Sequence, residues 1–344
     1  MKRVWLAISL LAAAGVAAGA VRLAGRSTEQ TPSRPSPAAS RSFSSSPSPT
    51  PAPAPKPDPV SLQALIQKQY DGRGLKLGRV IARNSAFTRY SATFESGPLT
   101  ISGTLHIPRG AGPFPILVFN HGYRDPATYV NGEGLRREQD YLAQHGYAVL
   151  HVDFRNHAQS DDDPAAEANL RLGYTEDAIN AVLAVKSSTL PALDRERIGM
   201  LGRSMGGGVT LNVAVVRPDL VGAFVLFDPV SSNTVDNFNK WTAGSAAGRR
   251  ILSAHGTPLE NPTFWRNVSP VGFFGRVAAP ILIHHGTADT STPLAWTRRT
   301  VAALEAKGKD VTLMLYQGEP HVFGAAWPLA ISRTLAFFDT HLKG

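Results

Sequence analysis

The stretch RIGMLGRSMGGG, residues 197–208, decides the fold. An apolar run ends at Leu201, and Ser204 follows between Gly202 and Gly206 before a second apolar run begins. The pattern Gly-x-Ser-x-Gly between a strand and a helix is typical of a nucleophile elbow, a tight turn that exposes a serine over a sheet edge. Because side chains two residues before and after the serine would clash, we expect glycine at both places. The alternative is a glycine-rich turn with a solvated serine.

Apolar runs of strand length surround this motif and alternate with helix-length segments such as residues 205–216 and 173–188, in which Thr175 is a candidate cap. The runs are residues 115–120, 147–154, 197–202, 223–228, 280–286 and 311–316. Continuous apolar runs are typical of strands that are buried on both faces. Residues 90–108 alternate in polarity around a Gly-Pro break and predict an antiparallel hairpin. The sequence therefore predicts an α/β fold with a mostly parallel, doubly wound sheet and an N-terminal antiparallel hairpin.

A serine hydroxyl attacks only when a base removes its proton and a carboxylate orients the base. After a nucleophile elbow these partners follow in the order acid, then histidine. Asp289 comes shortly after the run 280–286, and His321 shortly after the run 311–316. Because parallel strands end at one edge of a sheet, we expect both side chains beside Ser204. The sequence thus predicts a catalytic triad of Ser204, Asp289 and His321.

Each partner of the serine has a rival in the sequence. Asp228 ends the run 223–228 and is an alternative acid, or else a turn residue. We favour Asp289 because it lies in a loop beyond its strand. His157 is an alternative base, but it precedes the serine in the chain, which the usual order disfavours.

Attack by a serine places negative charge on the substrate oxygen, which two N–H donors must stabilise. We assign one donor to the backbone N–H of Met205, which directly follows the serine. We assign the second to the N–H of Tyr123, in the loop after the first parallel strand, with its ring in the pocket wall. The alternative for that loop is a strand-end turn built on His121 and Gly122.

The interval 230–274 is long for a connection between strands and is rich in aromatic residues. Its aromatic residues are Phe238, Trp241, Phe264, Trp265, Phe273 and Phe274. We expect a small helical cap insertion there, whose aromatic side chains either line the substrate pocket or pack against the core. The acidic run at residues 160–164 lacks the spacing of a calcium loop, so it predicts a solvated loop. No metal and no cofactor is expected.

Residues 1–26 combine a basic start, an apolar stretch and the small-residue pattern Ala18-Gly19-Ala20. This predicts a signal peptide or, because the stretch approaches the ~20 residues that span a bilayer, an N-terminal membrane anchor. Residues 27–59 hold 10 of the 26 prolines and predict a disordered Pro/Ser/Ala-rich spacer. We therefore expect an exported protein, secreted or in the periplasm or cell envelope, with a catalytic domain over residues 60–344.

The charge of the chain does not indicate a nucleic-acid partner. Residues 1–60 carry seven basic and two acidic side chains, so +5 of the net charge of +9 lies there and +4 on the remaining 284 residues. No basic run interleaved with aromatic residues is present. The chain has no cysteine, which excludes disulfides, so its stability depends on the core.

Five motifs together resemble α/β-hydrolases, and more narrowly the catalytic domain of the prolyl oligopeptidase family and the related dienelactone-hydrolase-like esterases. They are HGY at 121, DFRNHAQSD at 153, LDRERIGMLGRSMGG at 193, APILIHHGTADTSTP at 279 and YQGEPHVF at 316. The resemblance implies that Ser204 is the nucleophile, Asp289 the acid and His321 the base. Prolyl oligopeptidases proper also carry a β-propeller that filters peptides, for which this sequence shows no segment, and use a tyrosine side chain as oxyanion donor, which is displaced here.

We therefore expect a serine hydrolase that cleaves a carboxylic ester through an acyl-enzyme intermediate. A serine-type peptidase acting on short peptides is the alternative with the same chemistry. A non-catalytic envelope-binding module on a stalk is the alternative from another class. The expected partner is a small ester or short peptide, with a membrane tether through the N-terminal segment as a further option.

Overall fold

The computed structural model describes residues 56–344. The predicted signal peptide or anchor, and most of the predicted spacer, lie outside these residues. Among the helices between residues 56 and 344, none has both the length and the apolar character needed to cross a membrane.

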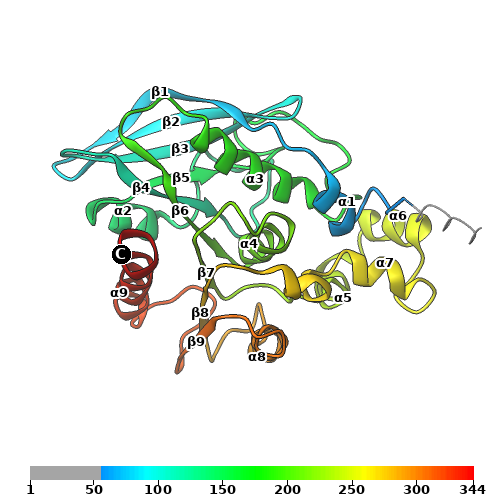
Figure 1. Ribbon diagram of the computed structural model, residues 1–344. Coiled ribbons are helices and arrows are strands. Elements are labelled where there is room, and N and C mark those ends of the chain that lie inside the picture. The colour runs from blue at the N-terminus through cyan, green and yellow to red at the C-terminus, as the bar shows by residue number, and fades with distance from the viewer. Residues whose placement is uncertain (1–55) are drawn as a thin grey trace, which may run out of the picture. The chain divides into compact units, whose positions relative to one another are not determined.

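The described residues build one sheet of nine strands in the order β1-β2-β3-β5-β4-β6-β7-β8-β9 (Figure 1). The strands are β1 (Arg73–Arg83), β2 (Phe87–Ser96), β3 (Leu99–Pro108), β4 (Phe114–Asn120), β5 (Ala148–Val152), β6 (Leu193–Arg203), β7 (Ala223–Phe227), β8 (Ile281–Gly286) and β9 (Val311–Tyr316). Strands β1 to β3 are antiparallel, and β3 also pairs antiparallel with β5. The pairs from β5 through β4, β6, β7 and β8 to β9 are all parallel. The predicted mostly parallel sheet and its antiparallel hairpin are confirmed.

The strand β1 was not predicted. Its sequence RGLKLGRVIAR carries four basic residues, and most of its side chains are at least partly exposed. β1 is an edge strand of the sheet, so its side chains are not covered on both faces as those of the inner strands are. Charged side chains on an edge strand also discourage pairing with another chain. The apolar runs that predicted the inner strands are therefore missing in β1.

Helices cover both faces of the sheet (Figure 1). They are α1 (Leu62–Gln67), α2 (Arg136–Gln144), α3 (Leu172–Lys186), α4 (Met205–Val216), α8 (Leu294–Glu305) and α9 (Trp327–Phe338). In β4, Ile116 and Val118 join the core beneath α3, α4 and α8, whereas Leu117 and Phe119 join the core beneath α2 and α9. Successive strand residues point to opposite faces, so an uninterrupted apolar run fills both layers.

The start of α3 differs from the prediction. The helix begins at Leu172, and Arg171 precedes it with φ of 55° and no side-chain cap. Thr175 lies inside the helix, fully buried, and its hydroxyl accepts a hydrogen bond of 3.0 Å from Asn212. The capping role of Thr175 is therefore wrong, because buried Leu172 and Tyr174 extend the apolar face of the helix upstream.

Short helices fill the interval between β7 and β8, where the cap was expected. They are α5 (Thr234–Asn237), a π-helical turn (Phe238–Thr242), α6 (Ala246–His255), α7 (Pro262–Asn267) and a 3₁₀ segment (Pro270–Arg276). Phe264 and Trp265 pack with Phe238 in a separate small core. Phe274 joins the main core, with Phe273 packed against it. Most of the aromatic residues in this interval are therefore packing residues.

Candidate active site

The turn between β6 and α4 holds Ser204 in a strained conformation. Its φ is 55° and its ψ is −120°, a region that non-glycine residues rarely occupy. A Cβ atom on Gly202 would overlap the carbonyl oxygen of Gly206, and one on Gly206 would overlap that of Asn120. The predicted need for both glycines is confirmed. The Ser204 N–H donates to the Phe227 carbonyl at 3.0 Å, which ties the turn to β7.

Asp289 and His321 meet at the edge where β8 and β9 end. The Nδ1 atom of His321 lies 2.8 Å from Oδ2 of Asp289, whose side chain is fully buried. The Thr292 hydroxyl donates to the same oxygen at 2.5 Å, and the N–H groups of Ser291 and Thr292 donate to Oδ1 at 2.7 and 3.0 Å. Burial alone would raise the pKa of Asp289, but the hydrogen bonds from His321 and Thr292 lower its pKa to about 2. Asp289 is therefore ionised at neutral pH.

His321 and Ser204 line one cavity. The His321 side chain is 23% exposed, so its ring is partly open to solvent. Within residues 56–344, His321 accepts or donates no hydrogen bond with the Ser204 hydroxyl. Such bonds are often long in unliganded enzymes and tighten when substrate binds. The structure brings the three predicted residues to one rim, and their division of roles remains a prediction.

The rival acid Asp228 also lies at this rim but has different surroundings. It is fully buried, its Oδ1 accepts the Gly286 N–H at 2.9 Å, and its Oδ2 has no partner in the described part of the chain. Burial raises the pKa of Asp228 to about 8, and the neighbouring Asp289 charge adds to this rise. His321 is hydrogen-bonded to Asp289 and not to Asp228.

The rival base His157 lies away from the cavity. It is 1% exposed, and its ring packs edge-on against His121 and Tyr129. Its Nδ1 contacts the Arg155 carbonyl at 3.0 Å. A histidine enclosed in this way is a core residue. This agrees with the expectation that the base follows the serine in the sequence, which disfavoured His157.

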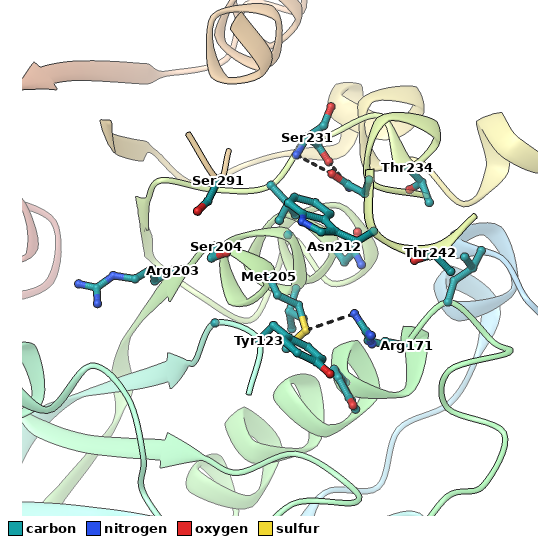
Figure 2. Close-up of a pocket in the computed structure, with 18 of the residues that line it drawn as sticks. Tyr123, Arg171, Arg203, Ser204, Met205, Asn212, Ser231, Thr234, Thr242 and Ser291 are labelled. Carbon is teal, nitrogen blue, oxygen red and sulfur yellow. Dashed lines mark hydrogen bonds between the residues drawn. The ribbon is translucent and has the colours of Figure 1, made fainter. Parts of the chain in front are cut away.

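The loop after β4 passes beside Ser204. A Cβ atom on Gly122 would lie 3.3 Å from the Ser204 Cβ, so the backbone approaches the serine closely. Met205 is the first residue of α4, where an N–H has no partner within the helix. Tyr123 is 54% exposed, and the Arg171 guanidinium lies 4.9 Å from the centre of its ring (Figure 2). Of the two predicted N–H donors, that of Met205 begins α4 and that of Tyr123 lies in the loop after β4, and their role remains a prediction.

The cavity beside Ser204 has a volume of about 540 Å³ and mixed polarity (Figure 2). Its apolar wall includes Leu170, Met205, Val209, Val230, Phe238, Trp241 and Val268, and its polar wall includes Glu167, Arg171, Asn212, Ser231 and Thr234. Arg171 pairs with Glu167 through two contacts of 2.7 Å and approaches the Met205 sulfur at 4.0 Å. Of the six aromatic residues in the predicted cap, Phe238 and Trp241 line the cavity.

Sequence reasoning missed the residues that hold Asp289. The N–H groups of Ser291 and Thr292 donate to its carboxylate, as backbone N–H groups two and three positions after an aspartate commonly do. The letters DTST, residues 289–292, carried that signal.

One group of three potential metal ligands occurs within residues 56–344, namely Asp228, Asp289 and His321, with one ligand atom of each within 4.8 Å of the others. His321 and Asp289 are already hydrogen-bonded to each other. The same two groups can serve proton transfer without an ion.

Known proteins resemble this chain in sequence and in fold. The family described as the prolyl oligopeptidase family matches residues 134–344. Cutinase est1 of Thermobifida alba is 30% identical over 146 residues, which is 38% of this chain and 46% of that protein. The acylaminoacyl peptidase of Pyrococcus horikoshii has a TM-score of 0.60 and 25% identity over 75% of this chain and 42% of its own.

Acetyl xylan esterase 1 of Thermoanaerobacterium sp. JW/SL YS485 has a TM-score of 0.61 and 19% identity, and the match covers 82% of this chain and 95% of the esterase. These structures confirm the predicted α/β-hydrolase fold. The chain spans about half the length, or less, of the curated relatives it matches.

Proposed function

This chain belongs to the prolyl oligopeptidase family, and we propose that it is a serine hydrolase that cleaves a carboxylic ester through an acyl-enzyme. The observation that carries the proposal is the short contact of His321 with an ionised Asp289, on the wall of the cavity that also exposes Ser204. In this proposal the Ser204 hydroxyl attacks the ester carbonyl, and His321 Nε2 takes its proton. His321 then protonates the leaving alcohol, and water releases the acid by the same steps in reverse.

Asp289 holds the imidazole in the tautomer that this sequence of steps requires. Its Oδ2 accepts the Nδ1–H of His321, so Nε2 is left without a proton and is free to accept that of the Ser204 hydroxyl. Because the pKa of Asp289 is held at about 2, the proton stays on the imidazole when it becomes charged. The N–H groups of Met205 and Tyr123 stabilise the oxyanion in this proposal.

The cavity supports an ester over a peptide as substrate. Its volume of about 540 Å³ suits a small or medium acyl group, and its apolar wall, which includes Leu170, Met205 and Val209, can receive an acyl chain. The relatives include proteins named cutinase and acetyl xylan esterase. The structural match to an acylaminoacyl peptidase keeps a short peptide as the alternative substrate.

Replacement of the nucleophile tests the proposal most simply. We expect Ser204→Ala to lower kcat on p-nitrophenyl acyl esters by a factor on the order of 10⁶, because the covalent step is lost. Circular dichroism checks that the variant folds. Full activity in Ser204→Ala would refute the serine mechanism.

A second measurement separates esters from peptides. We expect kcat/KM for p-nitrophenyl acyl esters to exceed that for aminoacyl p-nitroanilides by more than the intrinsic difference in reactivity of the two bonds. An enzyme that turns over the anilides as efficiently as the esters would be a peptidase.

We also propose that the protein is exported through residues 1–26, on the basis of the basic start and apolar stretch alone. Mass spectrometry of the mature N-terminus after expression in a host with an intact export system tests this. Cleavage after the Ala18-Gly19-Ala20 pattern is the expected result. An intact N-terminus on membrane-associated protein would indicate the anchor instead, and intact protein in the cytoplasm would refute export.

A further inference from the structure

We propose that Asp228 is a reserve acid of this active site, a positioning residue that can hold His321 when Asp289 cannot. The inference rests on the proposed function, because it gives the proposed base a second partner. Asp228 follows β7, and Asp289 follows the neighbouring parallel strand β8. Neighbouring parallel strands deliver their following residues to one sheet edge. The fold thus places two carboxyl groups where the reaction uses one.

Distance and burial single out Asp228 among the groups that the proposed mechanism does not use. One oxygen of Asp228, one of Asp289 and one ring nitrogen of His321 all lie within 4.8 Å of one another. The Oδ2 atom of Asp228 is buried and has no hydrogen-bond partner among residues 56–344. A buried oxygen without a partner is costly, so its place beside the base needs an explanation.

The hydrogen bonds explain why Asp289 and not Asp228 carries the charge in the intact protein. Two buried carboxylates at this separation cannot both ionise at neutral pH. Asp289 accepts from His321, from the Thr292 hydroxyl and from two backbone N–H groups, whereas Asp228 accepts one N–H, from Gly286. Burial accordingly raises the pKa of Asp228 to about 8, while the pKa of Asp289 falls to about 2.

Asp289 and His321 are the titratable groups of the site that face Asp228, and two others lie near it. His285 is 3.8 Å from the Asp228 carboxylate, but burial lowers its pKa, and its ring nitrogens contact Thr297 and the Thr292 carbonyl. Arg203, at the end of β6, is engaged by Glu138 at 2.6 Å. Burial is the main cause that keeps Asp228 protonated, and the Asp289 charge adds to it. Truncation of Asp289 removes that charge and admits water beside Asp228, so the pKa of Asp228 falls and its ionised form becomes accessible.

Truncation of Asp289 would open space between Asp228 and His321. An ionised Asp228 then accepts the Nδ1–H of His321, directly or through a water molecule in that space. The proton of the Ser204 hydroxyl still moves to Nε2 of His321 and returns to the leaving alcohol. Asp228 stays ionised throughout, so no proton moves to it.

A double-mutant cycle with Asp289→Ala and Asp228→Asn tests the proposal. Loss of the acid in serine hydrolases without a reserve costs on the order of 10⁴ in kcat. We expect Asp289→Ala to lose only on the order of 10² in kcat/KM on a p-nitrophenyl ester. Asp228→Asn should lower kcat/KM at least tenfold more in the Asp289→Ala background than it does in the parent protein. A loss of about 10⁴ in Asp289→Ala with no further loss in the double variant would overturn the proposal.

The Asp289→Asn variant supplies a matched control. Its amide fills the space that alanine vacates and keeps Asp228 away from His321. We therefore expect Asp289→Asn to be at least tenfold less active than Asp289→Ala, although it is the smaller chemical change. Equal activity of the two variants would contradict a reserve acid.

The pH profile adds a readout that a purely structural role would not change. In Asp289→Ala, kcat/KM should rise with the ionisation of Asp228, and Asp228→Asn should remove that limb of the profile. If the pH profile of Asp289→Ala and that of the double variant Asp289→Ala/Asp228→Asn have the same limbs, the proposal is overturned.

Two further controls separate the possible failures. Circular dichroism and thermal melting check that each variant folds, and Asp289→Ser replaces Asp289→Ala if the latter does not fold. If Ser204→Ala is fully active, the proposed function itself fails. If Ser204→Ala is inactive and the effects of Asp289→Ala and Asp228→Asn multiply independently, the reserve acid alone fails.

Discussion

The ends of β7 and β8 present the same chemical group in two different states. Asp228 and Asp289 are both buried carboxyl groups that follow neighbouring strands. The pKa of Asp289 lies near 2 and that of Asp228 near 8. Burial acts in the same direction on both, so the difference arises from the donors that surround Asp289 and that Asp228 lacks. Hydrogen-bond donors, more than depth in the protein, select the charged partner of His321.

Removal of the charge of Asp289 should have the largest effect on activity. We expect Asp289→Asn to lower kcat by a factor on the order of 10⁴, because the amide can favour the wrong imidazole tautomer. Steady-state kinetics on a p-nitrophenyl ester measures this. Asp194→Asn is a matched control, because Asp194 also accepts a hydrogen bond from a basic side chain, that of Arg197, but lies at the opposite end of β6 from Ser204. A loss below tenfold in Asp289→Asn would mean that Asp289 does not orient the base.

The raised pKa of Asp228 should make the stability of the protein depend on pH. Its pKa in the folded protein is raised to about 8, against ~3.9 for an unfolded chain. Between these values the folded state holds a proton that the unfolded state releases, so the Asp228 contribution to stability falls as pH rises.

Asp228→Asn cannot release that proton. The free energy of unfolding of Asp228→Asn minus that of the parent should therefore rise by up to about 1.4 kcal/mol per pH unit between pH 5 and 8. Above pH 8 this difference should stay constant. Urea denaturation at a series of pH values measures the gain. A difference between the two proteins that does not change with pH would show that Asp228 is ionised in the folded state.

The smallest expected effect comes from one donor to Asp289. Thr292→Val removes the hydroxyl that bonds Oδ2 and keeps both backbone N–H donors. A hydrogen bond to a charged group is worth about 1.5–3 kcal/mol, so we expect a loss of about 10- to 100-fold in kcat/KM, larger toward acid pH because the pKa of Asp289 rises. Thr300→Val, which removes a buried hydroxyl bonded to Ser232, is the control. If both variants keep full activity, the hydroxyl does not support the acid.

The sequence was sufficient for the inner sheet and for the residues at its active edge. Continuous apolar runs predict strands that are buried on both faces, and a glycine two residues before and after Ser204 predicts a tight turn. Both signals lie within a few consecutive residues, so they can be read without knowledge of distant contacts. Asp289 and His321 could be placed because each follows a parallel strand, and such strands end at a shared edge. The charged edge strand β1 carries no comparable run and was missed.

Other features depend on contacts between distant segments that periodicity does not encode. The separation of Asp228 and Asp289 depends on the register of β7 and β8. The enclosure of His157 depends on the rings of His121 and Tyr129, which both lie in the segment between β4 and α2. In the same way, only packing decides that Trp241 lines the cavity whereas Trp265 fills a separate core.

A crystal structure of the protein after reaction with a fluorophosphonate tests the central claim most directly. The account predicts phosphorus bound to the Ser204 Oγ, with His321 still paired to Asp289. It also predicts a phosphoryl oxygen about 2.7–3.1 Å from the backbone N–H of Met205. A phosphonate bound to another side chain, or a His321 ring turned away from both Ser204 and Asp289 in the adduct, would contradict it.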